Sequence, residues 1–302
     1  LSASLNPLTR IEPEIGVKCK GCEFKTGESD DGFSQCWGNR AENPEILNLV
    51  QLGNVNRHHD MLVDDLIRKG KVLMSDFPSD ILDPENRGKP YYKNRPFWQL
   101  TRKEEYMDPE IHSELLSLPE PLHFIDFETS RMALPYHQGM RPYENVAFQW
   151  SCHTVRNAGE QIEHSEWINT EEAFPNFEFA RSLMKQVGRT GSILIWSHHE
   201  NTILRDILAQ MEKYNHSDSE LEEWLTWITN DKENGRPGNL VDMDKLARMG
   251  YFHPYAGGRT SIKVTLPAVL QSFTSPRIEQ WLTEFEQGVN LFSSNGDGVV
   301  SP

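Results

Sequence analysis

Residues 124–129 read Phe-Ile-Asp-Phe-Glu-Thr and place two carboxylates one residue apart at the end of an apolar run. Alternate side chains of an extended strand share a face, so we expect Asp126 and Glu128 to project together. The apolar side chains of Ile125 and Phe127 then point into a core. The residues before Asp126, namely Leu122, Phe124 and Ile125, are too apolar for an exposed strand. The acids are therefore expected where a buried strand emerges, and a buried carboxylate needs a partner or a metal. A solvated strand end without a function is the alternative.

Length and charge limit the classes of function. A chain of 302 residues has room for two domains, or for one large core with an appendage. Its formal net charge of −15 argues against sequence-independent wrapping of nucleic acid, which depends on Lys and Arg. A metal-bridged site is still compatible with this charge, because bound cations neutralise both carboxylates and phosphate. No apolar run approaches the length of a membrane span, so we expect a soluble, cytoplasmic protein with no membrane partner.

The first forty residues contain three of the four cysteines, namely Cys19, Cys22 and Cys36. A Cys-x-x-Cys pair on a turn that contains glycine brings two thiolates to one soft metal, so we expect an iron–sulfur cluster or Zn²⁺ here in preference to unligated thiols. A fourth ligand could come from residues before Leu1, from His58, or be absent. Cys152 lies in a predicted strand, where it is expected to be a buried, small apolar side chain.

Residues 44–118 are predicted to form short helices and loops. Asp60 is a candidate cap for a helix over 61–67, and Asp108 followed by Pro109 predicts the start of another helix that runs to Leu116. Between them, residues 91–103 interleave aromatic and basic side chains. Such a stretch can stack bases and hold phosphates, or it can pack against a domain, and we favour packing.

From Pro121 onward, the pattern predicts an α/β fold with a mixed sheet and helices on it. The predicted strands cover residues 122–127, 146–155, 162–168 and 193–196. The predicted helices cover residues 175–187, begin again near Glu200, and recur around 220–228 and 241–249.

Glu200 is predicted to lie in the first turn of the helix that follows the fourth of these strands. If that strand lies beside the first, Glu200 faces Asp126 and Glu128 across a gap suited to one or two divalent ions. The helix dipole also favours an acid at this place without any catalytic role. His198 and His199 beside it are candidates for catalysis by proximity, although histidines at a helix start more often cap or pack.

The chain from Pro121 onward resembles the ribonuclease-H-like exonucleases of the Asp-Glu-Asp-Asp class. The first motif of that superfamily is Asp-x-Glu on its first strand, matched by Asp126 and Glu128. Its second motif is an Asp that opens a helix, with Leu four residues later, and Glu200 with Leu204 takes this place with Glu instead of Asp. More narrowly, residues 124–302 resemble the bacterial family called domain of unknown function 2779. The sequence motifs on which this resemblance rests are Phe-Ile-Asp-Phe-Glu-Thr, Arg141-Pro142-Tyr143, Phe148-Gln149-Trp150-Ser151, His199-Glu200-Asn201-Thr202 and Ser261-Ile262-Lys263.

The resemblance implies a 3'–5' exonuclease that hydrolyses DNA or RNA with two Mg²⁺ or Mn²⁺ ions. By analogy Asp126, Glu128 and Glu200 are the ligands, while Asp242 and Lys263 support the site. A last motif, Tyr or His with Asp on a helix, is expected after Pro302, because Asp297 lies in a turn flanked by glycines. We interpret both ends of the chain as cut, and expect this stretch by itself to be inactive. The alternative is a non-catalytic scaffold of the same fold that binds nucleic acid or protein.

Three segments are therefore predicted. Residues 1–43 resemble the cysteine-rich tail of a RecB-like nuclease with an iron–sulfur cluster, whose catalytic domain would precede them in the same chain. Residues 44–118 are predicted to be a helical linker region. Residues 119–302 are predicted to be the ribonuclease-H-like domain, truncated at its C-terminus.

Overall fold

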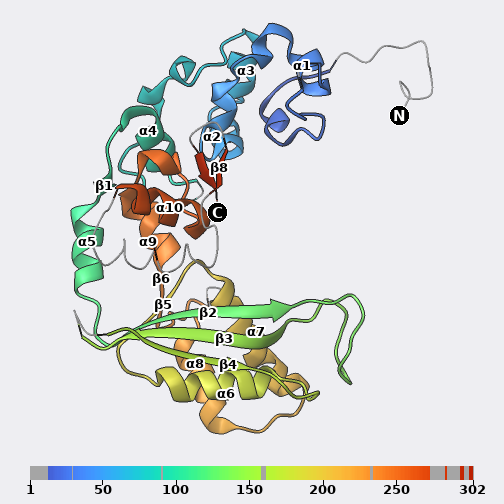
Figure 1. Cartoon of the computed structure of the whole chain (residues 1–302), viewed down its shortest axis with the longest axis vertical. Coiled ribbons are helices and arrows are strands. Elements are labelled where there is room, and N and C mark those ends of the chain that lie inside the picture. Colours follow the sequence, from blue (N-terminus) through green and yellow to red (C-terminus); the bar gives the residue numbers. More distant parts are fainter. Residues whose placement is uncertain are drawn as a thin grey trace. The chain divides into compact units, whose positions relative to one another are not determined.

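The computed structural model of the chain describes residues 13–28, 30–89, 91–157, 161–231, 234–272, 283, 293–295 and 299–301. The chain divides into two compact units (Figure 1). One unit comprises Leu1–Met107 together with Arg248–Pro302, and the other comprises Asp108–Ala247. The boundaries therefore fall near residues 107 and 247, and differ from the divisions at 43 and 118 that the sequence pattern suggests.

The unit Asp108–Ala247 is built on a five-stranded mixed sheet with the order β4-β3-β2-β5-β6. Its strands are β2 (Leu122–Ser130), β3 (Val146–Val155), β4 (Glu163–Ile168), β5 (Ser192–Ile195) and β6 (Leu240–Asp242). Neighbours among β2, β3 and β4 run antiparallel, whereas β5 is parallel to β2 and β6 is parallel to β5. The predicted α/β class with a mixed sheet is confirmed.

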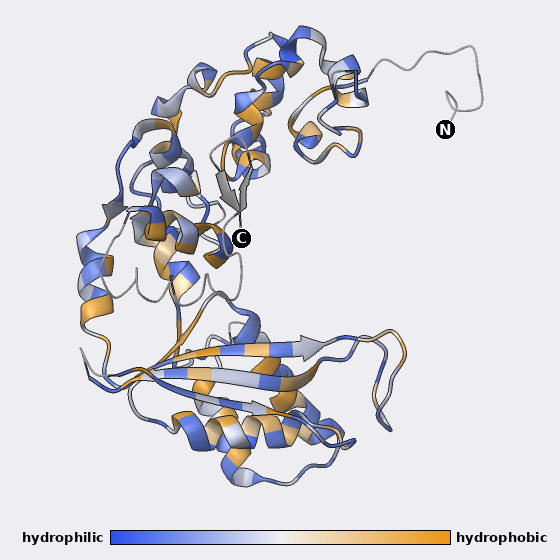
Figure 2. Ribbon diagram, viewed as in Figure 1, coloured by the Kyte–Doolittle hydropathy of each residue, from blue (hydrophilic) through white to orange (hydrophobic). Residues whose placement is uncertain are grey.

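Helices α6 (Asn176–Val187), α7 (His199–Lys213) and α8 (Ser219–Ile228) pack on one face of the sheet. The unit also contains α5 (Pro109–Leu116), which precedes β2, and α9 (Met243–Gly250), which crosses the unit boundary. Ile125 and Phe127 of β2 join one apolar core with Phe179 of α6, Ile203 of α7 and Trp224 of α8. Figure 2 shows the resulting alternation of apolar and polar residues along the strands. No helix in the described part of the chain is long and apolar enough to cross a membrane.

Gly191 sets the place at which β5 joins β2. Its φ of +77° lies in the left-handed region, and a Cβ there would stand 2.0 Å from the carbonyl oxygen of Pro121. That carbonyl accepts a hydrogen bond from the Ser192 N–H at 2.9 Å, and Ser192 pairs with Leu122 in the parallel register. Only glycine combines this backbone conformation with so close an approach.

Most predicted elements agree with the structure to within a few residues, and Asp108 caps α5 through hydrogen bonds to the N–H groups of Glu110 and Ile111. The helix predicted over 241–249 is wrong at its start. Leu240–Asp242 form β6, whose residues pair with β5, and the helix begins only at Met243. A strand of three residues is too short to leave a period-two pattern, and its pairing partner is distant in sequence.

The other unit consists mainly of short helices. Its elements are η1 (Val17–Gly21), α1 (Gly32–Trp37), η2 (Gly38–Ala41), η3 (Glu45–Asn48), α2 (Leu52–His58), α3 (Leu62–Arg68), η4 (Met74–Asp76), η5 (Ser79–Ile81), α4 (Asn94–Thr101), β1 (Tyr106–Met107), β7 (Tyr251–Phe252), η6 (Pro254–Ala256), α10 (Ile262–Ser272), β8 (Ser293–Asn295) and β9 (Val299–Ser301). One apolar core joins Phe33 and Trp37 to Ile46 and Val55. A division after residue 43 would therefore cut through a single core.

The helix predicted over 61–67 is present as α3, but Asp60 does not cap it. Asp60 and Met61 both have positive φ, and Met61 takes the cap position without a side-chain hydrogen bond. The buried side chain of Asn56 replaces the expected cap, because its Oδ1 accepts the N–H of Asp64 at 3.1 Å. A cap supplied by the preceding helix leaves no signal at the helix start.

The stretch of interleaved aromatic and basic residues packs within its unit. Tyr91, Arg95 and Trp98 are buried, and the Arg95 guanidinium donates to the Gly258 carbonyl from Nε at 3.1 Å and from Nη2 at 3.0 Å. The Arg102 guanidinium lies 3.6 Å from the centre of the Tyr106 ring. The favoured structural interpretation of this stretch agrees with these contacts, which leave Arg95 unavailable to phosphate.

Candidate functional site

The Asp-x-Glu pair lies on the face of β2 that the helices do not cover. Asp126 and Glu128 are both exposed, while Ile125 and Phe127 on the opposite face are 5% and 4% exposed. The predicted alternation is therefore confirmed. The expectation that these two carboxylates are buried is wrong, because even Phe124 on the same face is 41% exposed. The pairing of β2 with β3 shifts by one residue directly after Glu128, and Phe148 of β3 has no partner on β2 in this register. Such irregularities bend a strand and redirect its side chains.

The buried carboxylate is instead Glu200, in the first turn of α7. Only 4% of its surface is exposed, and its Oε2 has no hydrogen-bond partner in the described part of the chain. The pKa of Glu200 is raised to about 7, first by burial and then by the negative charges of Asp126 and Asp242, against the lowering effect of its own backbone N–H. The structure thus brings Asp126, Glu200 and Asp242 into electrostatic contact.

Asp242 ends β6 and holds two backbone segments beside Glu200. Its Oδ1 accepts the N–H of Ser197 at 3.1 Å and the N–H of Lys245 at 3.0 Å. The second bond caps α9, and the first fixes the turn between β5 and α7, where Ser197 has a φ of +81°. Because β2, β5 and β6 run parallel, their carboxyl ends lie at the same end of the sheet, and Asp126, Glu200 and Asp242 come together there.

The two histidines before Glu200 have different surroundings, and both are exposed. His199 places its Nε2 3.4 Å from the Thr129 hydroxyl on β2. The carbonyl oxygen of His198 accepts hydrogen bonds from the N–H and the hydroxyl of Thr202, both at 3.0 Å. His198 therefore shapes the start of α7, while His199 is the histidine that contacts the strand of the Asp-x-Glu pair.

The remaining predicted residues are less closely grouped. Glu128 is not among the groups that shift the pKa of Glu200. Lys263 is exposed in the first turn of α10, which belongs to the other unit. Among the described residues, no group of three or more His, Cys, Asp or Glu side chains is arranged to hold a metal ion.

Comparison with known proteins bears on this region. Residues 123–261 match the family model "Domain of unknown function (DUF2779)". The matched segment contains Asp126, Glu128, Glu200 and Asp242 and stops before Lys263. No curated protein and no solved structure matches the chain. The DUF2779 match supports the narrower of the two resemblances and assigns no activity.

The cysteines of the other unit lie outside the DUF2779 match. Cys19 and Cys22 are partly buried and pack against the apolar core, whereas Cys36 is exposed on α1. His58, the candidate fourth ligand, stacks on the Tyr91 ring with centroids 5.1 Å apart. Cys152 is fully buried in the sheet, as expected, and burial raises the pKa of its thiol.

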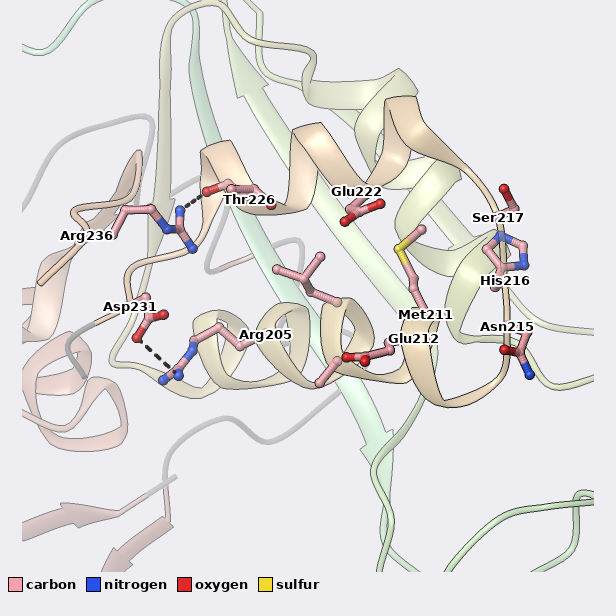
Figure 3. Close-up of a pocket in the computed structure, with 12 residues that line it drawn as sticks. Arg205, Met211, Glu212, Asn215, His216, Ser217, Glu222, Thr226, Asp231 and Arg236 are labelled. Atoms are coloured by element: carbon pink, nitrogen blue, oxygen red, sulfur yellow. Dashed lines mark hydrogen bonds and ion pairs between the residues drawn. The ribbon is translucent and has the colours of Figure 1, made fainter. Parts of the chain in front are cut away.

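A polar pocket of about 760 Å³ lies between α7 and α8 in the DUF2779 segment (Figure 3). The Arg205 guanidinium stands 3.4 Å from the Asp231 carboxylate at its margin. Arg236 donates to the Thr226 carbonyl and, at 3.0 Å, to the Thr229 carbonyl. Both arginines thus have structural partners, and the three carboxylates at the sheet edge are the stronger candidate for chemistry.

Proposed function

We propose that the protein is a metal-dependent nuclease that hydrolyses phosphodiester bonds of DNA or RNA. The observation that supports this most is Glu200, a buried carboxylate with an unpartnered oxygen and a pKa of about 7 beside two further carboxylates. A structural acid in a core is normally paired, so an unpaired one among like charges indicates a place for a cation.

The chemistry of the donors fits a hard divalent cation. Mg²⁺ and Mn²⁺ prefer carboxylate oxygens, and a positive charge here would offset the repulsion that raises the pKa of Glu200. Asp126, Glu128 and Glu200 would hold the ion or ions. A bound divalent cation polarises a phosphoryl oxygen and makes water a better nucleophile. Asp242 keeps the turn before Glu200 in place through the Ser197 N–H, and His199 borders the site at Thr129.

The finer assignment is a ribonuclease-H-like 3'–5' exonuclease. It is supported by the Asp-x-Glu pair on the first strand of the sheet and by the acid that opens the helix after the fourth strand. Lys263 is proposed as a supporting residue on the resemblance alone. The RecB-like character of residues 1–43 and an iron–sulfur or Zn²⁺ site at Cys19, Cys22 and Cys36 are proposals of the same kind.

Hydrolysis of labelled single-stranded DNA and RNA by the full-length protein tests the nuclease proposal. We expect cleavage with Mn²⁺ or Mg²⁺, none with EDTA, and loss of cleavage in Asp126→Asn and Glu128→Ala variants. Glu212→Gln is a matched control, because Glu212 is an exposed acid on α7. Cleavage that survives both substitutions at the Asp-x-Glu pair would show that another site performs the reaction.

A non-catalytic scaffold is the second candidate. The observation in its favour is that no three of the acids in the described ranges are grouped for one ion. A scaffold would bind nucleic acid or protein without cleaving it at any divalent-ion concentration. Activity that disappears in the Glu128→Ala variant would exclude this alternative.

A further inference from the structure

The connection between β2 and β3, residues 131–145, exposes an unusual set of side chains for an acidic chain. Leu134, Tyr136 and Tyr143 are 82%, 53% and 61% exposed. Arg131 and Arg141 on the same connection are exposed as well. Single exposed apolar side chains are ordinary on a protein surface, but aromatic groups together with arginines are the composition enriched at contact surfaces.

A hollow of about 410 Å³ lies beside this connection, lined by Arg131, Arg141 and Tyr143 together with residues of α7. Within the described residues, the Arg141 guanidinium has no hydrogen-bond or ion-pair partner. Arg131 uses only its Nε, which donates to the Tyr143 carbonyl at 3.1 Å. The outer guanidinium nitrogens of both arginines are therefore available to an anion.

The carboxylates that also line this hollow are already engaged. Glu144 accepts hydrogen bonds from the Lys213 ammonium at 2.6 Å and from the Tyr214 hydroxyl at 3.2 Å, and Asp206 accepts from the Asn145 amide. Although burial acts to raise the pKa of Glu144, the N–H of Arg141 and the Lys213 ammonium hold it below its usual value. Lys213 and Glu144 offset each other, while Asp206 keeps its charge because the Asn145 amide is neutral. The two arginines therefore outweigh the one remaining carboxylate, and the hollow presents a net positive charge to an incoming ligand.

The backbone holds the Tyr143 ring outward. Tyr143 has a φ of +60°, a region that a bulky residue adopts only when its surroundings enforce it. Its N–H donates to the Met132 carbonyl at 2.8 Å, and its carbonyl accepts from Arg131. The same bonds therefore hold the Arg131 guanidinium against the Tyr143 backbone, while the Tyr143 side chain stays exposed to solvent.

We propose that Arg131, Arg141 and Tyr143 form a contact surface that binds single-stranded nucleic acid and directs it to the acids on β2. Proteins that bind single strands combine cations along the backbone with aromatic rings on which bases stack. Arg131 follows Glu128 by three residues, about 10 Å along an extended strand. One nucleic-acid strand can therefore contact both Arg131 and the acids on β2. The inference rests on the proposed nuclease function, for which it names the substrate as single-stranded.

Binding without cleavage tests the surface. The probe is a 5'-labelled oligothymidine or oligouridine of about 12 nucleotides, long enough to cover one binding site of this type. Fluorescence anisotropy is measured with the full-length protein in EDTA over a range of salt. We expect the Arg131→Gln, Arg141→Gln double variant to weaken binding at low salt and to lower the slope of log K against log salt by about 1.4, since each phosphate contact to a single strand contributes about 0.7.

Tyr143→Asn removes the ring and supplies a residue that tolerates positive φ, so it preserves the backbone. We expect it to weaken binding by about 5- to 150-fold, the range for loss of one stacked base, and Tyr143→Phe to bind like the natural protein. Arg57→Gln is the matched control, because Arg57 is an exposed arginine on α2, in the other unit. We expect its affinity and salt slope to be unchanged.

The inference is overturned if the double arginine variant and Tyr143→Asn bind with unaltered affinity and salt slope, or if a duplex of the same length binds as tightly as the single strand. It is also overturned if the natural protein binds neither oligonucleotide. Asp126→Asn separates this inference from the nuclease proposal, because we expect this variant to lose cleavage and still to bind single strands in EDTA. A protein that binds single strands through these residues, yet cleaves nothing with Mn²⁺, would refute the nuclease proposal and support the surface.

Discussion

The Asp242 carboxylate accepts the Ser197 N–H at 3.1 Å, and this bond joins the end of β6 to the turn that positions Glu200. The same oxygen accepts the Lys245 N–H at 3.0 Å and so begins α9. Asp242 therefore stabilises the backbone around Glu200, while its charge raises the pKa of Glu200. The two effects can be separated by substitution.

Asp242→Ala removes both hydrogen bonds and the charge, so we expect a loss of about 1–3 kcal/mol in the free energy of unfolding. Asp242→Asn retains an acceptor oxygen and removes only the charge. We expect most of the stability to be kept and the pKa of Glu200 to fall toward its ordinary range. Urea unfolding measures the first effect, and nuclear magnetic resonance of the Glu200 carboxyl carbon during a pH titration measures the second. Equal stability losses in both variants would contradict the role of the acceptor.

Glu200→Gln should stabilise the protein at alkaline pH. Because the pKa of Glu200 rises from 4.5 to about 7 on folding, the folded state binds this proton more tightly than the unfolded state does. The stabilisation from the bound proton is complete below about pH 4.5 and is lost as the pH rises to about 7. The penalty for an ionised Glu200 at pH 8 corresponds to ~3 kcal/mol. We expect the variant to recover this much at pH 8 and little at pH 4.5.

Urea unfolding at several pH values between 4.5 and 8 measures this difference. Glu212→Gln serves as the control, because Glu212 is exposed on the same helix and should show no comparable pH-dependent gain. The experiment is done in EDTA, since a bound cation would itself stabilise the ionised carboxylate. A difference that stays constant with pH would show that the gain does not come from ionisation of Glu200.

Divalent ions should raise the thermal unfolding midpoint. An ion that binds only the folded state adds about 2.7 kcal/mol at a concentration of 100 times its dissociation constant. We expect Mg²⁺ and Mn²⁺ to stabilise the natural protein and Asp126→Ala to lose this response. Calorimetry with the same ions reports the binding directly. A response that is unchanged in Asp126→Ala would place the ion elsewhere.

Gly191→Ala should disrupt the start of β5. The added Cβ would meet the Pro121 carbonyl oxygen at 2.0 Å in a backbone conformation with φ of +77°. We expect a loss of about 2–4 kcal/mol from strain and overpacking together. Gly257→Ala is the comparison, because Gly257 has left-handed φ and ψ of +55° and +35°, and an added Cβ would meet only the Gln99 amide nitrogen at an ordinary 3.8 Å. It should lose only about 1 kcal/mol, and equal losses would exclude the contact with Pro121 as the cause.

The cysteine pattern predicts a metal in the purified protein. Elemental analysis distinguishes iron from zinc, and visible absorbance identifies an iron–sulfur cluster. We expect the metal to be lost in a Cys19→Ser, Cys22→Ser double variant and retained in Cys152→Ser, because Cys152 is buried in the sheet. A natural protein without bound metal would show that Cys19 and Cys22 serve as packing residues of the core.

Local pattern predicted the elements that have a strong period. The alternation of 124–129 predicted a shared face for Asp126 and Glu128, and the apolar spacing of α7 predicted a helix near Glu200. It failed where the interaction is distant. Asn56 replaces Asp60 as the cap of α3, and β6 is visible only through its pairing with β5. Periodicity reports the face of an element and does not report what another segment contributes to it.

By itself, the sequence determined the α/β class, the shared face of Asp126 and Glu128, and the position of Glu200 at a helix start, because side-chain period and helix signals are properties of neighbouring residues. The tertiary structure decided which carboxylate is buried. Asp126 and Glu128 are exposed, while Glu200 is enclosed and lies near Asp126 and Asp242. Burial and the distance between charges depend on strand pairing and packing across the fold, and these set the pKa on which the proposed chemistry rests.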